Sequence, residues 1–182
     1  MNTSDEVHED KPQTRLRARK KAPRVFTPGV IHVTQASLKG TENPESFFIK
    51  IVGVSGKLAE VNVGDVIKRG VSASSLYRIK SALKINNDEL LEYFDISRAT
   101  FIRRTKGKSK LTRVETDRVY RYSRLMALAT NMFHGDKEEA LRWLKNPAYA
   151  FKGETPLEHA RTEFGAHEVE TLIGRIEHGI AT

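Results

Sequence analysis

Apolar residues recur every three or four positions along most of the chain after residue 43, which is the spacing of amphipathic helices. Asn43 followed by Pro44 is typical of a helix start and Gly53 of a helix end, so residues 44–52 are predicted to form a short helix. Further helices are predicted over residues 73–85 behind Ser72, 88–94 behind Asn87, 98–106 behind Ser97, 113–134 behind Thr112 and 137–145 behind Asp136. Two more are predicted near the end of the chain, one that starts at Pro156 behind Thr155 and one that contains Val169. The predicted fold class is all-α.

Residues 57–70 are the ambiguous stretch of this pattern. Val61 and Val63 alternate as they would in a strand, whereas Val66 and Ile67 ahead of a glycine fit a helical turn better. We therefore predict that this stretch is mostly helical.

Two of the predicted helices lie close enough in sequence to form a helix-turn-helix over residues 87–106. Leu90 and Phe94 share one face of the first helix. Ile96 and Phe101 have the spacing of a hydrophobic staple across the start of the second helix. These four side chains can pack together and hold the second helix at a fixed angle, with its other face turned outward.

The second helix and the residues after it carry charges of one sign, because six basic residues and no acid follow Asp95 as far as Lys110. A solvated helix normally mixes both signs, whereas a helix that meets a polyanion does not. Arginine can bind a guanine edge, while hydroxyls and lysines can contact phosphate. The candidate residues for binding operator DNA are Ser97, Arg98, Thr100, Arg103, Arg104, Lys106, Lys108 and Lys110; the alternative is a solvated helix pair in a small bundle.

The net charge of +8 is unevenly distributed along the 182 residues. Residues 1–135 hold 25 Lys and Arg against 14 Asp and Glu, whereas residues 136–182 hold 6 against 9. A basic body suits phosphate, and an acidic tail requires another partner. The long helix contributes four arginines that either extend the basic surface or pair with acids of the tail, namely Arg113, Arg118, Arg121 and Arg124.

Residues 1–42 are expected to form a flexible basic arm. Between Lys11 and Arg24 there are seven basic residues, two prolines and no acid, with too few bulky apolar side chains to offset the entropy of ordering. Such an arm serves either as a solubility tail or as a segment that follows a DNA backbone or groove.

Several classes of function are disfavoured by what the sequence lacks. The absence of cysteine excludes disulfides, iron–sulfur clusters and thiolate zinc sites, and the six histidines form no metal-binding pair, so we expect no metal and no cofactor. No nucleophile elbow, phosphate-cradling glycine loop or carboxylate pair indicates an enzyme, and His159 with Glu163 is interpreted as a surface helical pair. No apolar run approaches the roughly 18 residues of a membrane span and no signal sequence is evident, so we expect a cytoplasmic protein that does not contact the membrane.

The end of the chain carries a series of short motifs in the run EEALRWLKNPAYAFKGETPLEHARTEFGAHEVETLIGRIEHGI. In order they are Ala-x-x-Trp-Leu, Asn-Pro, Gly-x-Thr-Pro, Thr-Glu-x-Gly and Leu-x-Gly-Arg-Ile-Glu-His-Gly. This run resembles the C-terminal toxin-binding domain of the MbcA/ParS/Xre antitoxins over about residues 136–180. Residues 58–135 resemble an Xre-type helix-turn-helix more weakly, because Leu91 stands where that family usually has a small residue and Asp95 where it usually has glycine.

The resemblance implies a function and a partner. Antitoxins of this family are encoded beside RES-domain toxins that act on NAD, so the tail is expected to cover the active site of such a toxin. Trp143 is expected to anchor the core, with Gly153, Thr155 and Pro156 in a structured turn. The expected toxin-binding residues are Arg175, Ile176, Glu177, His178 and Gly179, for which a solvated helix terminus is the alternative.

Two expectations remain for the assembly. Gly174, inside the last helix, suggests the close approach of another backbone or a tightly fitted partner. Proteins of this geometry usually bind paired half-sites, so a homodimer within a larger toxin–antitoxin complex is expected. The predicted domains are an arm (1–42), a helical DNA-binding and dimerisation domain (43–135) and an antitoxin domain (136–182); the alternative function is a stand-alone transcriptional regulator without a toxin partner.

The basic helix leads to the first testable prediction. The double substitution Arg103→Ala, Arg104→Ala should weaken operator binding and make its salt dependence shallower, because each lost phosphate contact removes about 0.9 from the slope of log affinity against log salt. Titration of operator DNA at several salt concentrations measures both effects. An unchanged affinity and slope would contradict the assignment of this helix to DNA.

Overall fold

The computed structural model describes residues 42–54, 61–107 and 109–180, and within these ranges the chain is helical, with one isolated antiparallel bridge between Ser72 and Lys110. The all-α prediction is therefore confirmed. The arm predicted over residues 1–42 lies outside the described residues, apart from Glu42. The helices are α1 (Pro44–Val52), α2 (Val63–Arg69), α3 (Ser75–Leu83), α4 (Asn87–Phe94), α5 (Arg98–Lys106), α6 (Arg113–Met132), α7 (Lys137–Lys145), α8 (Pro156–His159) and α9 (Glu163–Glu177), with a 3-10 helix at Tyr149–Phe151.

Most of the predicted helix starts are confirmed by hydrogen bonds from backbone N–H groups to the side chain of the capping residue. These confirmed caps are Asn43, Ser97, Thr112, Asp136 and Thr155. The two threonines form full capping boxes, Thr112 with Glu115 and Thr155 with Glu158.

Two predicted starts were wrong. Asn86, not Asn87, caps α4, because its side-chain oxygen accepts hydrogen bonds from the backbone of Asp88 and Glu89. Ser72 does not cap α3, which begins at Ser75, because Ser72 is held in the bridge to Lys110 instead. A pairing between segments so far apart in sequence is not visible in the local pattern.

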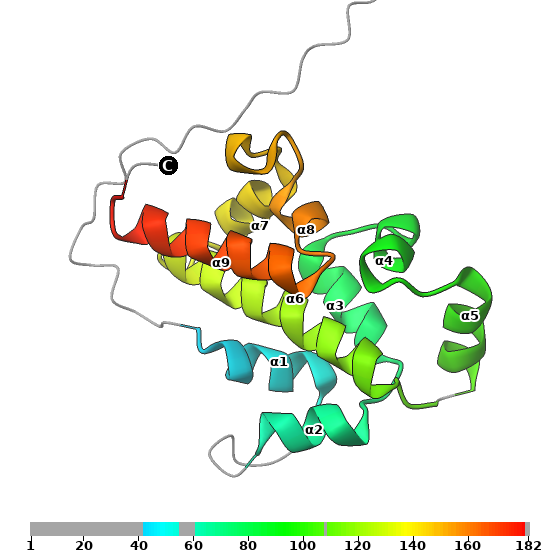
Figure 1. Ribbon diagram of the computed structural model, residues 1–182. Helices are drawn as coiled ribbons and strands as arrows, with labels where there is room; N and C mark the ends of the chain where they lie inside the picture. Colours follow the sequence, from blue (N-terminus) through cyan, green and yellow to red (C-terminus); the bar gives the residue numbers. More distant parts are fainter. Residues whose placement is uncertain (1–41, 55–60, 108, 181–182) are drawn as a thin grey trace, which may run out of the picture.

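The longest helix, α6, runs through the centre of the molecule. In Figure 1, α1 lies along one side of α6 and α7 and α9 lie along the other, while α3 and α4 pack towards its N-terminal half. From Val119 onward almost every position of α6 is buried or half-buried, as expected for a helix covered on all sides. The first turn differs, because Val114 is 59% exposed.

A single hydrophobic core spans the chain on both sides of residue 135. Its members include Phe48 of α1, Leu90 of α4, Tyr122 of α6, Trp143 of α7 and Val169 of α9. The Tyr122 hydroxyl donates weakly towards the backbone carbonyls of both Tyr93 and Leu157, which belong to different parts of the chain. The expectation that Trp143 anchors the core is confirmed.

The tail is also attached to α6 by ion pairs. Arg121 contacts Glu163 at 2.8 Å and donates to the carbonyl of Arg161, while Arg124 contacts Glu163 at 2.9 Å and Glu170 at 2.6 Å. Arg121 and Arg124 therefore pair with acids of the tail and do not extend the basic surface.

The fold leads to a prediction about pH. Burial acts to raise the pKa of Glu163, but hydrogen bonds from Arg121 and Arg124 outweigh it and hold that pKa below 4.5. Since the unfolded chain binds the proton more readily, the stability from this contact is present above about pH 4.5 and is lost as the pH falls through the lower, folded pKa. Glu163→Gln should lower the free energy of unfolding at pH 7 by about 1 kcal/mol or less, because the carboxylate is largely exposed, and should weaken this pH dependence.

Urea unfolding of both proteins between pH 3 and pH 7 measures the difference. Glu177→Gln, which changes an exposed carboxylate on the same helix, is the matched control. Identical pH profiles for Glu163→Gln and the unsubstituted chain would contradict the contribution of this contact.

Candidate functional site

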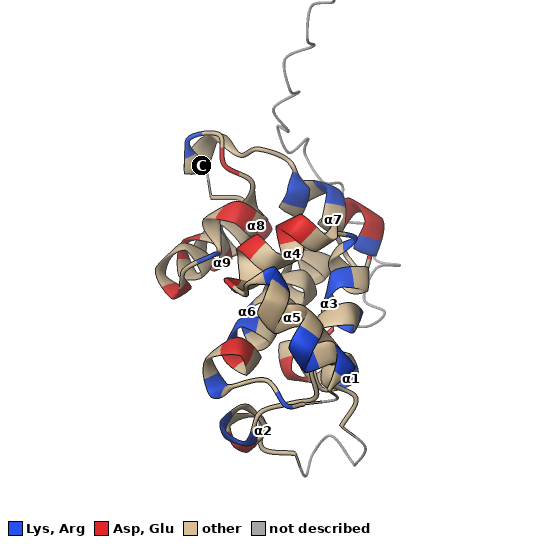
Figure 2. Ribbon diagram, turned by 90° about the vertical axis from the view of Figure 1, so that its right-hand side faces the viewer, with Lys and Arg blue, Asp and Glu red and all other residues tan. Residues whose placement is uncertain are grey.

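The second helix of the helix-turn-helix, α5, packs on the molecule through a narrow face. Phe101 is its buried residue, and its ring meets the ring of Tyr77 at a centroid distance of 5.4 Å in an edge-to-face arrangement. The rest of α5 projects from the body at one end of the molecule (Figure 1). Viewed from that end, Lys and Arg are prominent on α5, whereas Asp and Glu are prominent around α8 and α9 (Figure 2).

Two hydroxyls at the start of α5 are exposed or nearly so. Ser97 accepts a hydrogen bond from the backbone N–H of Thr100, and its hydroxyl donates to the Thr100 hydroxyl at 2.9 Å. Arg98 forms an exposed ion pair with Asp88, which contributes little to stability and can exchange for phosphate. Three of the predicted residues, Ser97, Arg98 and Thr100, therefore lie together at the N-terminal end of the helix.

Further along the helix and after it, Arg103, Lys106 and Lys110 are exposed. Arg104 was predicted to be available to DNA, but it does not lie on the outer face of α5. Its side chain is only 19% exposed, and it donates to the carbonyl of Lys110 and contacts Glu115 at 3.2 Å. Arg104 therefore fastens the end of α5 to the start of α6. Lys108 lies outside the described residues.

The structure adds two positions that the sequence analysis did not single out. Ala99 and Ile102 are exposed and join Arg103 and Lys106 at the spacing i, i+3, i+4, i+7. The helical spacing from Phe101, the residue of the staple, indicates this outer stripe, whereas the charged and hydroxyl groups by themselves do not include Ala99 and Ile102.

The turn between α4 and α5 is fixed by α6. Asp95 ends α4 in a left-handed conformation, with φ of 48°, which aspartate tolerates better than most residues. Arg118 contacts the Asp95 carboxylate at 3.0 Å and donates to the carbonyl of Phe94 at 2.6 Å. An aspartate where Xre-type domains usually have glycine therefore keeps the turn and gains a contact with α6.

The second candidate surface is the end of α9. Arg175, Glu177 and His178 are exposed, whereas Ile176 is half-buried and packs against the core. Gly179 has φ of 65° and closes the helix, since the next N–H, of Ile180, donates to the carbonyl of Arg175 at 2.8 Å. The predicted toxin-binding residues thus form one helix end with mixed charge.

Of the two alternatives for Gly174, the close approach of another backbone is wrong within the described chain, whereas a tightly fitted partner stays a prediction. A Cβ placed at this glycine would meet no atom within 4 Å, so no other backbone of the described chain approaches it.

His159 joins three segments of the tail. Its two ring nitrogens lie 2.8 Å from Glu154 and 2.7 Å from Glu168, and its ring stacks on Phe151 at 4.3 Å. Burial acts to lower the pKa of His159, but the two carboxylates outweigh it and raise that pKa above 6.5. The predicted surface pair with Glu163 was wrong, because Glu163 faces the arginines of α6.

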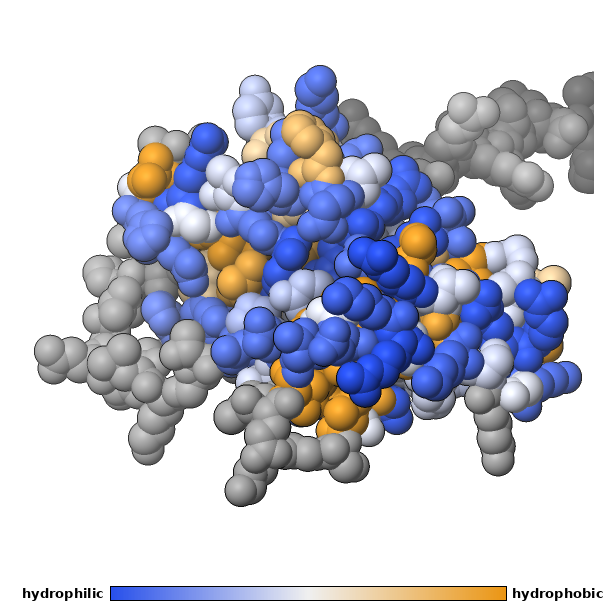
Figure 3. All heavy atoms as spheres, turned by 60° about the horizontal axis from the view of Figure 1, so that its bottom comes forward, coloured by the Kyte–Doolittle hydropathy of each residue, from blue (hydrophilic) through white to orange (hydrophobic). Residues whose placement is uncertain are grey.

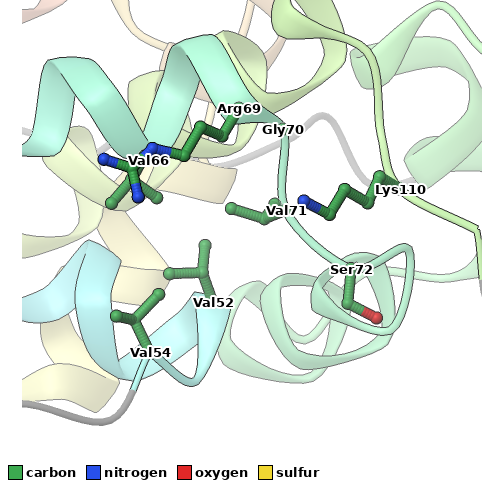
Figure 4. A pocket seen from close by; sticks show the side chains of 8 residues that line it. All are labelled: Val52, Val54, Val66, Arg69, Gly70, Val71, Ser72 and Lys110. Carbon is green, nitrogen blue, oxygen red and sulfur yellow. The ribbon is translucent and has the colours of Figure 1, made fainter.

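A small cavity of about 270 Å³ lies between α1, α2 and the segment that leads into α3 (Figure 4). Val52, Val66 and Val71 line it, with Arg69 and Lys110 at its edge. The surrounding face is mostly hydrophilic with separated apolar patches (Figure 3). The cavity lies where these helices meet, and Lys110, one of the basic residues that follow α5, is part of its lining.

Within the described ranges, no group of three or more His, Asp or Glu side chains is arranged to hold a metal ion. The same part of the chain contains no helix with the length and apolar character of a membrane span.

The fold and these surfaces define a class, namely a helix-turn-helix protein with a helical C-terminal region built onto the same core. Comparison with known proteins agrees with this class. Residues 63–124 match the Antitoxin Xre-like helix-turn-helix domain, and residues 128–179 match the Antitoxin Xre/MbcA/ParS C-terminal toxin-binding domain.

Individual relatives point to the same family. The chain is 32% identical over 159 residues to the Antitoxin Xre of Photorhabdus laumondii subsp. laumondii, covering 87% of this chain and 99% of that protein. It is 34% identical over 116 residues to the Antitoxin Xre of Yersinia enterocolitica (64% and 78% covered) and 26% identical over 122 residues to a Sphingobium protein named Prs ADP-ribosylating antitoxin (63% and 77% covered). The chain belongs to the Xre antitoxin family, and its toxin-binding domain implies a toxin as partner.

Because Arg103 is exposed and Arg104 is turned inward, replacing each with alanine should change the stability of the fold by a different amount. Arg104→Ala should lower the free energy of unfolding by about 1–3 kcal/mol, because it removes charge-assisted contacts that are largely shielded from water. Arg103→Ala should change it by no more than about 0.5 kcal/mol. Urea unfolding measures both, and equal losses for the two variants would contradict the inward placement of Arg104.

Proposed function

We propose that this protein neutralises a RES-domain, NAD-degrading toxin by covering the toxin's active site with the end of α9, and that it binds its own operator through α5 to regulate its expression in the cytoplasm. The observation that carries the proposal is the combination, on one core, of a helix-turn-helix with a cationic outer face and a toxin-binding domain with an exposed polar terminus. No catalytic activity is assigned to the chain.

The DNA part of the proposal rests on the geometry of α5. A recognition helix enters the major groove with its N-terminal residues towards the bases, and here those residues are Ser97, Arg98 and Thr100. Arg103 and Lys106 continue the same exposed side, and Lys110 follows after the helix. Phosphate contacts would position the helix, and Arg103 would be available to a guanine edge.

The toxin part rests on the end of α9. Arg175, Glu177 and His178 offer one guanidinium, one carboxylate and one imidazole beside the exposed apolar side chain of Ile180. Such a mixture suits a cleft that binds a dinucleotide, which contains both anionic and polar groups. The relative whose name includes ADP-ribosylation is compatible with a toxin that acts on NAD.

The two parts would communicate through α6. Arg118 holds the helix-turn-helix, Arg121 and Arg124 hold α9, and Arg161 next to α9 pairs with Glu92 of α4. A toxin that shifts α9 would thus act on contacts shared with the DNA-binding part, and by linkage DNA would affect toxin affinity equally. A homodimer would place two copies of α5 on paired half-sites, so the ratio of toxin to antitoxin would tune operator occupancy.

The proposal is tested by growth of cells that express the reading frame adjacent to this one, with variants of the chain supplied in trans. The full chain should restore growth, and Arg175→Glu, His178→Glu should not, because the variant loses the guanidinium and the imidazole at the end of α9 and presents carboxylates to the groups of the cleft that those side chains would contact. Operator affinity of that variant should stay within about twofold, since the substitutions are far from α5 along the chain. Point variants are preferable to removal of residues 136–182, which would uncover the buried second half of α6.

Lys152→Ala, which changes an exposed cation elsewhere on the same domain, is the matched control and should rescue fully. Full rescue of growth by Arg175→Glu, His178→Glu would contradict the proposal that the end of α9 covers the toxin's active site. A harmless neighbour would favour the alternative, a stand-alone transcriptional regulator.

A further inference from the structure

The outer side of α5 contains a large apolar side chain among its cations. Ile102 is 43% exposed, whereas Phe101, one position earlier, is 8% exposed. Arg103 directly follows Ile102, Arg98 precedes it by one turn, and Lys106 follows it by one turn, and all three are exposed. An isoleucine at this position exposes apolar surface to water in the free protein without covering the core.

The position of Ile102 on α5 turns its side chain away from the core. Successive residues of a helix are about 100° apart, so Ile102 lies about a quarter turn from Phe101, on the side that continues into Arg103 and Lys106. The view in Figure 2, in which α5 faces the reader, is the direction from which a partner would approach. Whatever binds this side of α5 would therefore meet Ile102 and Arg103 together.

The charge around Ile102 selects the kind of partner. A second copy of α5, or another basic surface, would bring like charges together at Arg98, Arg103 and Lys106, which is unfavourable. A duplex offers phosphates for the cations and, between them, the base edges of the major groove. DNA therefore accommodates the cations and the apolar side chain at the same time.

Among the base edges of the major groove, only thymine presents an apolar group, the C5 methyl. The other edges there are hydrogen-bond donors and acceptors, which would lose water against an isoleucine without gaining a partner. A β-branched side chain has few rotamers to lose, so it can pack on a methyl group at little cost in entropy.

We propose that Ile102 is a specificity-determining residue that selects a T·A base pair by packing on the thymine methyl. The inference rests on the proposed binding of α5 to DNA and deepens it by naming the base pair that is read.

The test uses a duplex selected from a random-sequence library by the full chain, in which each thymine is replaced in turn by deoxyuridine. This replacement removes only the methyl group. At one thymine per half-site it should weaken binding by the full chain about three- to tenfold at fixed salt, which corresponds to the burial of about one methyl group. Ile102→Ala should bind the thymine duplex more weakly by a similar factor and should not distinguish uracil from thymine at that position.

Val114→Ala is the matched control, because Val114 is a comparably exposed apolar residue outside α5. It should keep the full preference for thymine. Circular dichroism melting of each variant verifies that the fold is retained.

The outcomes separate the inference from the proposed function. If the full chain binds its selected duplex with the expected salt dependence but no uracil replacement weakens binding, or if Ile102→Ala remains as sensitive to uracil as the full chain, the role of Ile102 is overturned while DNA binding stands. If the full chain binds no duplex more tightly than random DNA, the operator-binding proposal is overturned together with this inference.

Discussion

The burial of α6 on all sides is the constraint on which the rest of the structure depends. The second half of α6 has apolar and small residues around its circumference and cannot be covered by one neighbour, so α1 is required on one side and α7 and α9 on the other. The helix-turn-helix and the toxin-binding region therefore share one core. Their stability is expected to be shared as well, because uncovering either side of α6 exposes apolar surface to water.

The arginines of α6 are the second consequence of that burial. Guanidinium groups that are shielded from water require partners, and Arg118, Arg121 and Arg124 find them in the turn after α4 and in α9. These charges join the two regions and are not part of an open basic surface. The free positive charge near the helix-turn-helix is thereby concentrated on α5 and the loop that follows it.

The two candidate surfaces lie at different ends of the molecule. In Figure 1, α5 projects from one end of the bundle and the last turn of α9 lies towards the other. A toxin and a DNA duplex would therefore have room to bind one chain together. Any influence of one on the other would pass through the contacts that join the two regions, which include the arginines of α6 and the pair between Arg161 and Glu92 of α4.

The sequence by itself determined the helices, most of their caps, the helix-turn-helix and the family resemblance, because these depend on spacing and residue type within a few positions, as at Ser97 with Thr100 or Thr112 with Glu115. Only the tertiary structure decided which polar groups face inward. Arg103 and Arg104 are adjacent residues of the same type, yet one is exposed and the other is held by Glu115 of α6, a partner that the local pattern does not name. His159 and Glu163 have the spacing of a pair, but each has stronger partners on other segments. The physical reason is that a side chain's surroundings are set by segments distant in sequence, which no local periodicity contains.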